Sequence, residues 1–162
     1  MKRFVYLFLF LMLLFLSGCS KLQKGTIYSF SSFGFPEKSV CHQYYIGKIE
    51  NYIEGNQDFQ FIVVDGLDGH GSISFESVNF PDYYLRHSNF KLILSQKEED
   101  ENFAKDASFY IRDGLGDQKL ISFESVNFPN YFIRHSNFIL YVMENDNSEI
   151  FKADATFKPI KR

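Results

Sequence analysis

The sequence predicts an all-β fold built from three similar units, and three observations support this prediction. The first is an internal repeat, because residues 73–95 and 121–143 are identical at 16 of 23 aligned positions. The second is a fainter upstream copy, in which residues 29–36 match residues 74–81. The third is that each unit consists of short alternating segments broken by turns, a pattern typical of β-strands.

Each unit supplies four segments that we expect to form strands. In the second unit they are residues 73–77, 83–87, 90–94 and 107–111, with a turn at residues 79–81 and an acidic loop before the last strand. A single four-stranded unit could not bury its apolar face, whereas three units around an axis can close a barrel and hide their edges. The predicted fold is therefore a twelve-stranded β-trefoil, with a β-sandwich or a three-bladed arrangement as alternatives.

Residues 1–18 have the pattern of a lipoprotein signal peptide. A basic start precedes an unbroken apolar run over residues 4–16, which is shorter than the about 20 residues that a membrane-spanning helix needs. The Leu-Ser-Gly-Cys sequence that follows resembles a bacterial lipobox, which would leave Cys19 as a lipidated first residue. An ordinary secretory signal is the alternative. We expect an extracytoplasmic, membrane-anchored protein with a tether over residues 19–26.

One domain is expected to fill the rest of the chain, over residues 27–162, with units at about 27–72, 73–120 and 121–162. The formal net charge of −3 argues against nucleic acid as a partner. Cys41 is the only cysteine besides Cys19, so we expect no intramolecular disulfide. We predict that Cys41 packs as a small apolar residue.

Polar residues recur in the second and third units where a strand pattern does not require them. They are Asn79 and Asn127, Tyr83 and Tyr131, Arg86 and Arg134, His87 and His135, Asn89 and Asn137, and Asp106 and Asp154. Imidazole, amide and carboxylate groups suit sugar hydroxyls, and an aromatic ring can cover the apolar face of a sugar. The set predicts sugar-binding pockets; a structural histidine and a turn-capping aspartate are the alternative for His87 and Asp106.

The first unit serves as an internal control. It keeps the aromatic frame, and His42 and Asp58 match the histidine and the aspartate of the other units. The asparagine, tyrosine, arginine and second asparagine are replaced there by Gly34, Lys38, Cys41 and Tyr44. We therefore expect working pockets in the second and third units and a weak or vestigial pocket in the first.

At these residues the chain resembles the arabinose-binding (AbfB) domain of α-L-arabinofuranosidase B, carbohydrate-binding module family 42. The resemblance lies in Ser-Phe-Glu-Ser-Val-Asn-Phe-Pro, then Tyr-(Leu or Ile)-Arg-His-Ser-Asn-Phe, an acidic loop and residues 151–157. It covers residues 27–162. The glycine that often follows the Asn-Phe-Pro turn in that family is replaced here by Asp82 and Asn130.

The resemblance implies a β-trefoil that holds terminal arabinofuranose side chains of arabinoxylan or arabinan. It places His87 with Asp106, and His135 with Asp154, in the pockets. It also implies a glycoside hydrolase as a partner, because such modules accompany α-L-arabinofuranosidases in L-arabinose metabolism. The alternatives are a surface protein-interaction trefoil that has lost sugar binding and an accessory subunit of an arabinofuranosidase.

A catalytic role is not expected from the chain itself. Glycosidases commonly place two carboxyl groups about 5 to 9.5 Å apart, whereas each candidate pocket has one matched carboxylate. The four histidines show no metal-ligand spacing, and the acidic run at residues 98–101 is expected to be a solvated loop. No cofactor and no metal are therefore expected.

Overall fold

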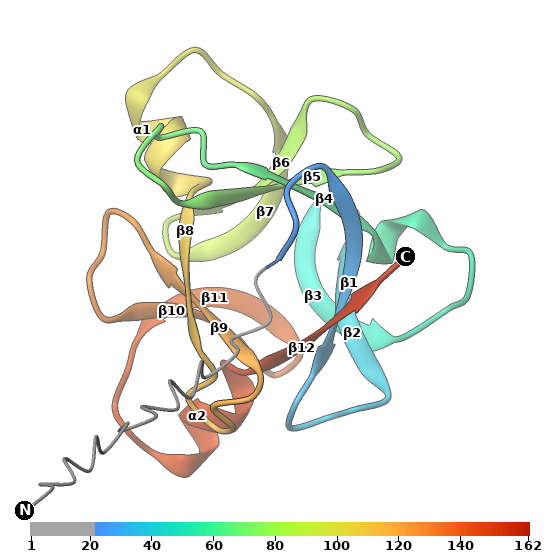
Figure 1. Cartoon of the computed structure of the whole chain (residues 1–162), viewed down its shortest axis with the longest axis vertical. Helices are drawn as coiled ribbons and strands as arrows, with labels where there is room; N and C mark the ends of the chain where they lie inside the picture. Colours follow the sequence, from blue (N-terminus) through green and yellow to red (C-terminus); the bar gives the residue numbers. More distant parts are fainter. Residues whose placement is uncertain (1–21) are drawn as a thin grey trace, which may run out of the picture.

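The computed structural model describes residues 22–162 and confirms the predicted β-trefoil, with twelve strands in three lobes (Figure 1). The first unit holds β1 (Thr26–Ser32), β2 (Lys38–Gln43), β3 (Ile46–Asn51) and β4 (Phe61–Asp65). The second holds β5 (Ile73–Ser77), β6 (Tyr83–Ser88), β7 (Lys91–Gln96) and β8 (Phe109–Asp113). The third holds β9 (Ile121–Ser125), β10 (Tyr131–Ser136), β11 (Ile139–Glu144) and β12 (Phe157–Lys161).

The first and fourth strands of the three units form a closed antiparallel barrel. β1 pairs with β4, β4 with β5, β5 with β8, β8 with β9, β9 with β12, and β12 again with β1. The hairpins β2–β3, β6–β7 and β10–β11 are joined to one another through β3, β7 and β11. Closure leaves the barrel without a free sheet edge, which explains why three units are needed.

The core contains one matching phenylalanine from each unit. Phe30, Phe75 and Phe123 are each at most 2% exposed, and their ring centroids lie 4.9 to 5.4 Å apart in edge-to-face geometry. Edge-to-face contacts of this kind add to the free energy gained by burying the rings. The Ser-Phe repeat of the sequence therefore supplies the centre of the fold.

A short helix precedes the last strand of each unit, in place of the acidic loop that the sequence predicts for the second unit. These helices are η1 (Gln57–Phe59), α1 (Glu101–Asp106) and α2 (Glu149–Asp154). Asp100 and Ser148 cap α1 and α2 by accepting the backbone N–H of Phe103 and Phe151, whose side chains are buried. These contacts stabilise two helical turns that are too short to give a periodic sequence signal.

The segment before β1 is packed against the barrel from Leu22 onward. The Leu22 side chain is 8% exposed and belongs to the main core, and the backbone N–H of Gly25 donates to the carbonyl of Val63 at 2.7 Å. Leu22 and Gly25, which lie within the expected tether of residues 19–26, therefore pack as part of the folded unit. The signal peptide over residues 1–18 and the lipidated Cys19 lie outside the described residues.

Candidate functional site

The tips of the three hairpins have an unusual backbone conformation. The residue pairs are Tyr44 and Tyr45, Asn89 and Phe90, and Asn137 and Phe138, and all six have φ between 48° and 65°. Two successive positive φ angles suit a tight hairpin turn, and asparagine tolerates this region better than most residues. The backbone conformation of the turn therefore explains why Asn89 and Asn137, two predicted sugar-binding residues, recur, without requiring that either contacts a sugar.

Each hairpin tip reaches the neighbouring unit: the first reaches the second, the second reaches the third, and the third reaches back to the first. The backbone N–H groups of Leu94, Val142 and Ile49 donate to the carbonyls of Tyr45, Phe90 and Phe138, respectively, at 2.8 to 2.9 Å. The histidine of one unit therefore lies against the turn that follows the first strand of the next unit. Three sites result, each at a junction between two units.

We name these sites after the unit that supplies the histidine and the aspartate. The first site combines His42 and Asp58 with Asn79, the second combines His87 and Asp106 with Asn127, and the third combines His135 and Asp154 with Gly34. The structure thus brings Asn79 to His42 and not to His87, which differs from the grouping by unit that the sequence suggested. The hairpin tips that cross to the next unit are the reason.

The second site has a complete polar bridge. The Nε2 of His87 lies 3.1 Å from Oδ1 of Asn127, and the Nδ2 of Asn127 donates to Oδ1 of Asp106 at 2.7 Å. Because the amide oxygen is an acceptor, the imidazole donates from Nε2. The hydroxyl of Ser125 donates to the same amide oxygen at 2.8 Å. The asparagine therefore fixes both the tautomer of the histidine and the position of the carboxylate.

Aromatic rings form a wall beside this bridge. Phe90 lies with its centroid 5.0 Å from that of Phe128 and 5.7 Å from that of Tyr131, and Phe128 lies 5.4 Å from the His87 ring. Phe90 remains 41% exposed. The second site thus presents polar groups next to an accessible ring face, which is that of Phe90. Tyr131, which the sequence grouped with His135, packs against Phe90 in this site instead.

The first site repeats this arrangement with two tyrosines. Asn79 accepts from His42 at 3.0 Å and donates to Asp58 at 2.7 Å. Tyr45 lies 6.1 Å from Tyr83 between ring centroids, and both rings contact Phe80. A hollow of about 330 Å³ opens here. The site that the sequence predicted to be vestigial therefore has the full histidine, asparagine and aspartate bridge.

The third site lacks that bridge. Gly34 occupies the asparagine position, and the buried Nε2 of His135 has no hydrogen-bond partner among the described residues, although it lies 3.2 Å from Oδ1 of Asp154. Lys38 takes the place of the tyrosine, with its Nζ 5.0 Å from the centroid of the Phe138 ring. A Cβ atom at Gly34 would lie 3.8 Å from Oδ1 of Asp154, an ordinary van der Waals contact, so a Cβ atom fits at this position.

The three sites also differ in the group beside the aspartate. Arg134 donates to Asp154 at 2.5 Å, whereas Nη1 of Arg86 lies 3.6 Å from Asp106. In the first site the matching residue is Cys41. The exposed fraction of the aspartate side chain is accordingly 34% in the first site, 19% in the second and 13% in the third.

The family model of the alpha-L-arabinofuranosidase B (ABFB) domain matches residues 28–158. This chain belongs to that family. Two similar relatives are the α-L-arabinofuranosidases B of Aspergillus niger and of Aspergillus kawachii. Each is 38% identical over 52 residues, a stretch that is 32% of this chain and 10% of the fungal protein. The ABFB domain described here therefore matches only a small part of those enzymes.

Solved structures share the fold of this ABFB domain. An arabinofuranosidase complexed with arabinofuranosyl-alpha-1,2-xylobiose superposes with a TM-score of 0.79 at 24% identity, over 88% of this chain and 32% of that chain. The protein SeviL, bound to asialo-GM1 saccharide, superposes with a TM-score of 0.65 at 9% identity, over 84% of this chain and 97% of that chain. Identities this low show the fold alone.

Burial sets the protonation of two site histidines in this ABFB domain. It lowers the pKa of His42 and of His135, against the opposing effect of Asp58 and Asp154. Arg134 lowers the pKa of His135 further. Both imidazoles are therefore kept neutral at pH 7, and a neutral imidazole suits an uncharged hydroxyl ligand. Burial also raises the pKa of Cys41 to about 12, in agreement with its predicted apolar packing.

The backbone conformation of the turn after the first strand explains why Asp82 and Asn130 can replace the glycine that the family often has there. Asp82 and Asn130 have φ of 66° and 65°, a region that glycine adopts at no cost and that Asp and Asn tolerate. Their backbone N–H groups donate to Glu76 and Glu124 at 2.9 and 2.8 Å. The recurrent glutamates therefore cap these turns.

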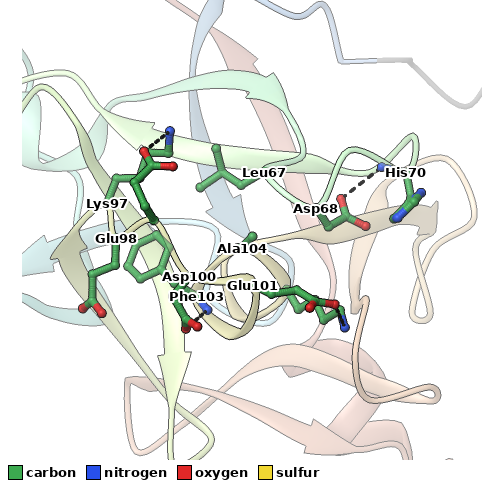
Figure 2. A pocket seen from close by; sticks show the side chains of 11 residues that line it. Leu67, Asp68, His70, Lys97, Glu98, Asp100, Glu101, Phe103 and Ala104 are labelled. Carbon is green, nitrogen blue, oxygen red and sulfur yellow. Dashed lines mark hydrogen bonds and ion pairs between the residues drawn. The ribbon is translucent and has the colours of Figure 1, made fainter.

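A further hollow of about 500 Å³ lies away from the candidate residues, between the loop after β4 and the acidic loop before α1 (Figure 2). Most of the charged side chains that line it have partners within the protein: Lys97 pairs with Glu99, Lys105 pairs with Glu101, and Asp100 caps α1. Over residues 22–162, no cluster of three or more histidine, cysteine or acidic side chains is placed to hold a metal ion. Within the same range, no helix is long and apolar enough to cross a membrane.

Proposed function

We propose that this ABFB domain is a non-catalytic carbohydrate-binding module that holds terminal L-arabinofuranose side chains of arabinoxylan or arabinan. The observation that carries the proposal is the histidine, asparagine and aspartate bridge beside exposed aromatic rings, which occurs in the first and second sites. Membership of the family supports the sugar, because its relatives are arabinofuranosidases.

The bridge suits a small sugar for a physical reason. The carboxylate retains acceptor capacity for hydroxyl groups, and the asparagine holds it at a fixed distance from the imidazole. Tyr45 in the first site and Phe90 in the second are 50% and 41% exposed, so each offers a ring face to the C–H face of a sugar. Fixed polar groups reduce the ordering cost of binding.

Binding at each site should be weak, because a single sugar makes few contacts. A dissociation constant on the millimolar scale corresponds to about 4 kcal/mol. Two sites on one domain that engage one branched chain raise the overall affinity through effective concentration. The module is therefore built for polymers rather than free sugars.

The proposal includes no reaction at these sites. Each site presents one matched carboxylate, whereas glycosidases commonly use two that are about 5 to 9.5 Å apart. Asp58 and Asp106 each accept a hydrogen bond from an asparagine amide, which holds the carboxylate in place to accept further hydrogen bonds from a ligand. Hydrolysis of the bound polysaccharide would belong to a separate glycoside hydrolase partner.

Anchoring through a lipidated Cys19 completes the proposal. Residues 1–18 and the Leu-Ser-Gly-Cys sequence support an extracytoplasmic lipoprotein that holds decorated polysaccharide near its membrane. Incorporation of labelled palmitate into the full chain tests this, with Cys19→Ala as the matched control. Equal labelling of both proteins would reject lipidation at Cys19.

The sugar proposal is tested by calorimetric titration of protein from Ser20 onward with arabinofuranosyl oligosaccharides, using xylo-oligosaccharides as controls. We expect about two sites and no binding of unbranched xylo-oligosaccharides. The double variant Asn79→Ala, Asn127→Ala should abolish measurable binding while thermal melting confirms a folded protein. Absence of binding to the wild type would reject the proposal and favour a protein-interaction role.

A further inference from the structure

We propose that the first site extends beyond His42 and Asp58 and binds the sugar residue next to the terminal one, whereas an arginine occupies the matching space in the other two sites. This inference rests on the proposed function and assigns a ligand length to one of its sites. The first site would thus recognise a side chain together with part of the backbone that carries it.

The first site consists of two adjoining hollows. One, of about 330 Å³, is lined by residues that include Tyr44, Tyr45 and Phe80. The other, of about 210 Å³, is lined by residues that include Cys41, Ile53 and Phe59. His42, Gln43 and Asp58 line both hollows, so the histidine and the aspartate lie between them. A ligand that contacts these two groups can therefore continue in either direction.

The second hollow follows from two local differences in the first unit. Cys41 stands where the other units have Arg86 and Arg134, whose guanidinium groups lie 5.3 and 5.0 Å from the ring centroids of Phe103 and Phe151. The first unit is also three residues shorter between its histidine and its aspartate, and it has the three-residue η1 where the others have six-residue helices. The arginine and the longer helix are thus both missing beside Asp58.

The lining of the second hollow suits a neutral sugar. Glu50, Asn51 and Asn56 supply polar atoms, and Ile53, which is 57% exposed, supplies an apolar surface. Lys48 is paired with Glu50 at 2.6 Å, so these two charges offset each other and the lysine does not neutralise Asp58. The Asp58 carboxylate would repel a uronic acid or a phosphorylated sugar. The expected occupant is therefore an uncharged sugar such as a xylose or arabinose residue.

Site-resolved NMR titration of ¹⁵N-labelled protein tests the extension. The two probes are methyl α-L-arabinofuranoside and arabinofuranosyl-xylobiose, and the amides of residues 42, 87 and 135 report on the three sites. At the first site we expect the longer ligand to bind about tenfold more tightly, because an added sugar makes new contacts. At the second site we expect the two affinities to agree within about twofold.

Two exposed isoleucines provide a matched pair of variants. Ile53→Ser should remove most of the preference for the longer ligand at the first site, whereas Ile150→Ser, on α2 and 73% exposed, should leave it unchanged. Cys41→Arg should have the same effect as Ile53→Ser by filling the hollow, if thermal melting shows that it folds.

The outcomes separate the two proposals. If neither probe perturbs any site, the proposed function fails. If both probes bind the first site with equal affinity and the amide of Ile53 does not shift, the extension fails while sugar binding stands. An unchanged preference in Ile53→Ser would likewise overturn the extension.

Discussion

The second and third sites each have a histidine, an aspartate and an arginine at matching positions, yet the neighbouring unit contributes a different residue to each. The second receives Asn127, whereas the third receives Gly34 because the chain returns to the first unit at that point. In the second site the amide links the imidazole to the carboxylate, and in the third the arginine is the main partner of the carboxylate. Near-identical units therefore do not make identical sites.

The comparison predicts first that the arginine matters more for stability in the third site. Arg134→Met should lower the free energy of unfolding by about 2 to 3 kcal/mol, because it leaves the buried Asp154 without its charged partner. Arg86→Met should cost about 1 kcal/mol or less, because its pair with Asp106 is longer and more exposed. Urea denaturation of the two variants measures both values. Equal losses would show that the two arginines are equivalent.

The second prediction concerns the binding site to which each asparagine contributes. Asn127→Ala should weaken sugar binding at the second site at least tenfold, since it removes hydrogen bonds to both His87 and Asp106. Asn79→Ala should do the same at the first site and leave the second unchanged. Each variant is the control for the other in an NMR titration with an arabinofuranosyl oligosaccharide. Loss at the second site in Asn79→Ala would contradict assembly across unit boundaries.

The third prediction restores the missing bridge. Gly34→Asn should raise affinity at the third site by about three- to tenfold, because a Cβ atom fits at the position and Nε2 of His135 lacks an acceptor. Gly34→Ala is the matched control, since it fills the same space without an amide. The same titration checks the result. Equal affinities for the two variants would show that the amide does not distinguish the second site from the third.

The fold was predictable from the sequence because its signals are local and repeated. The Ser-Phe-Glu-Ser segments and the turns after them mark each unit, and the structure gives their phenylalanines and glutamates clear roles. The residue types of the candidate sites were likewise visible, and the structure brings His87 and Asp106 within 3.2 Å of each other. Regular spacing therefore predicted the architecture and the polar set.

The assignment of residues to sites was not predictable in the same way. It depends on hairpin tips that cross to the next unit, a long-range contact that a comparison of aligned units does not reveal. Aligning the units placed Gly34 and Cys41 in one weakened pocket, whereas the structure places Gly34 in the third site and Cys41 in the first. The helices α1 and α2 were missed because their six residues depend on capping and on one buried phenylalanine each.

The smallest expected effect concerns pH and again involves the unsatisfied histidine of the third site. Burial lowers the pKa of His135 and of His42 in the folded protein below the ordinary value of 6.5. As pH falls below 6.5 the unfolded chain takes up protons before the folded protein does, so stability decreases toward the folded pKa. We expect Tm to be about 2 to 4 °C lower at pH 5.5 than at pH 7.5. His135→Gln should reduce this difference, and His70→Gln, at an exposed position, should leave it unchanged. A difference of the same size in His135→Gln would mean that the third-site imidazole does not contribute to the pH dependence, despite its missing hydrogen-bond partner.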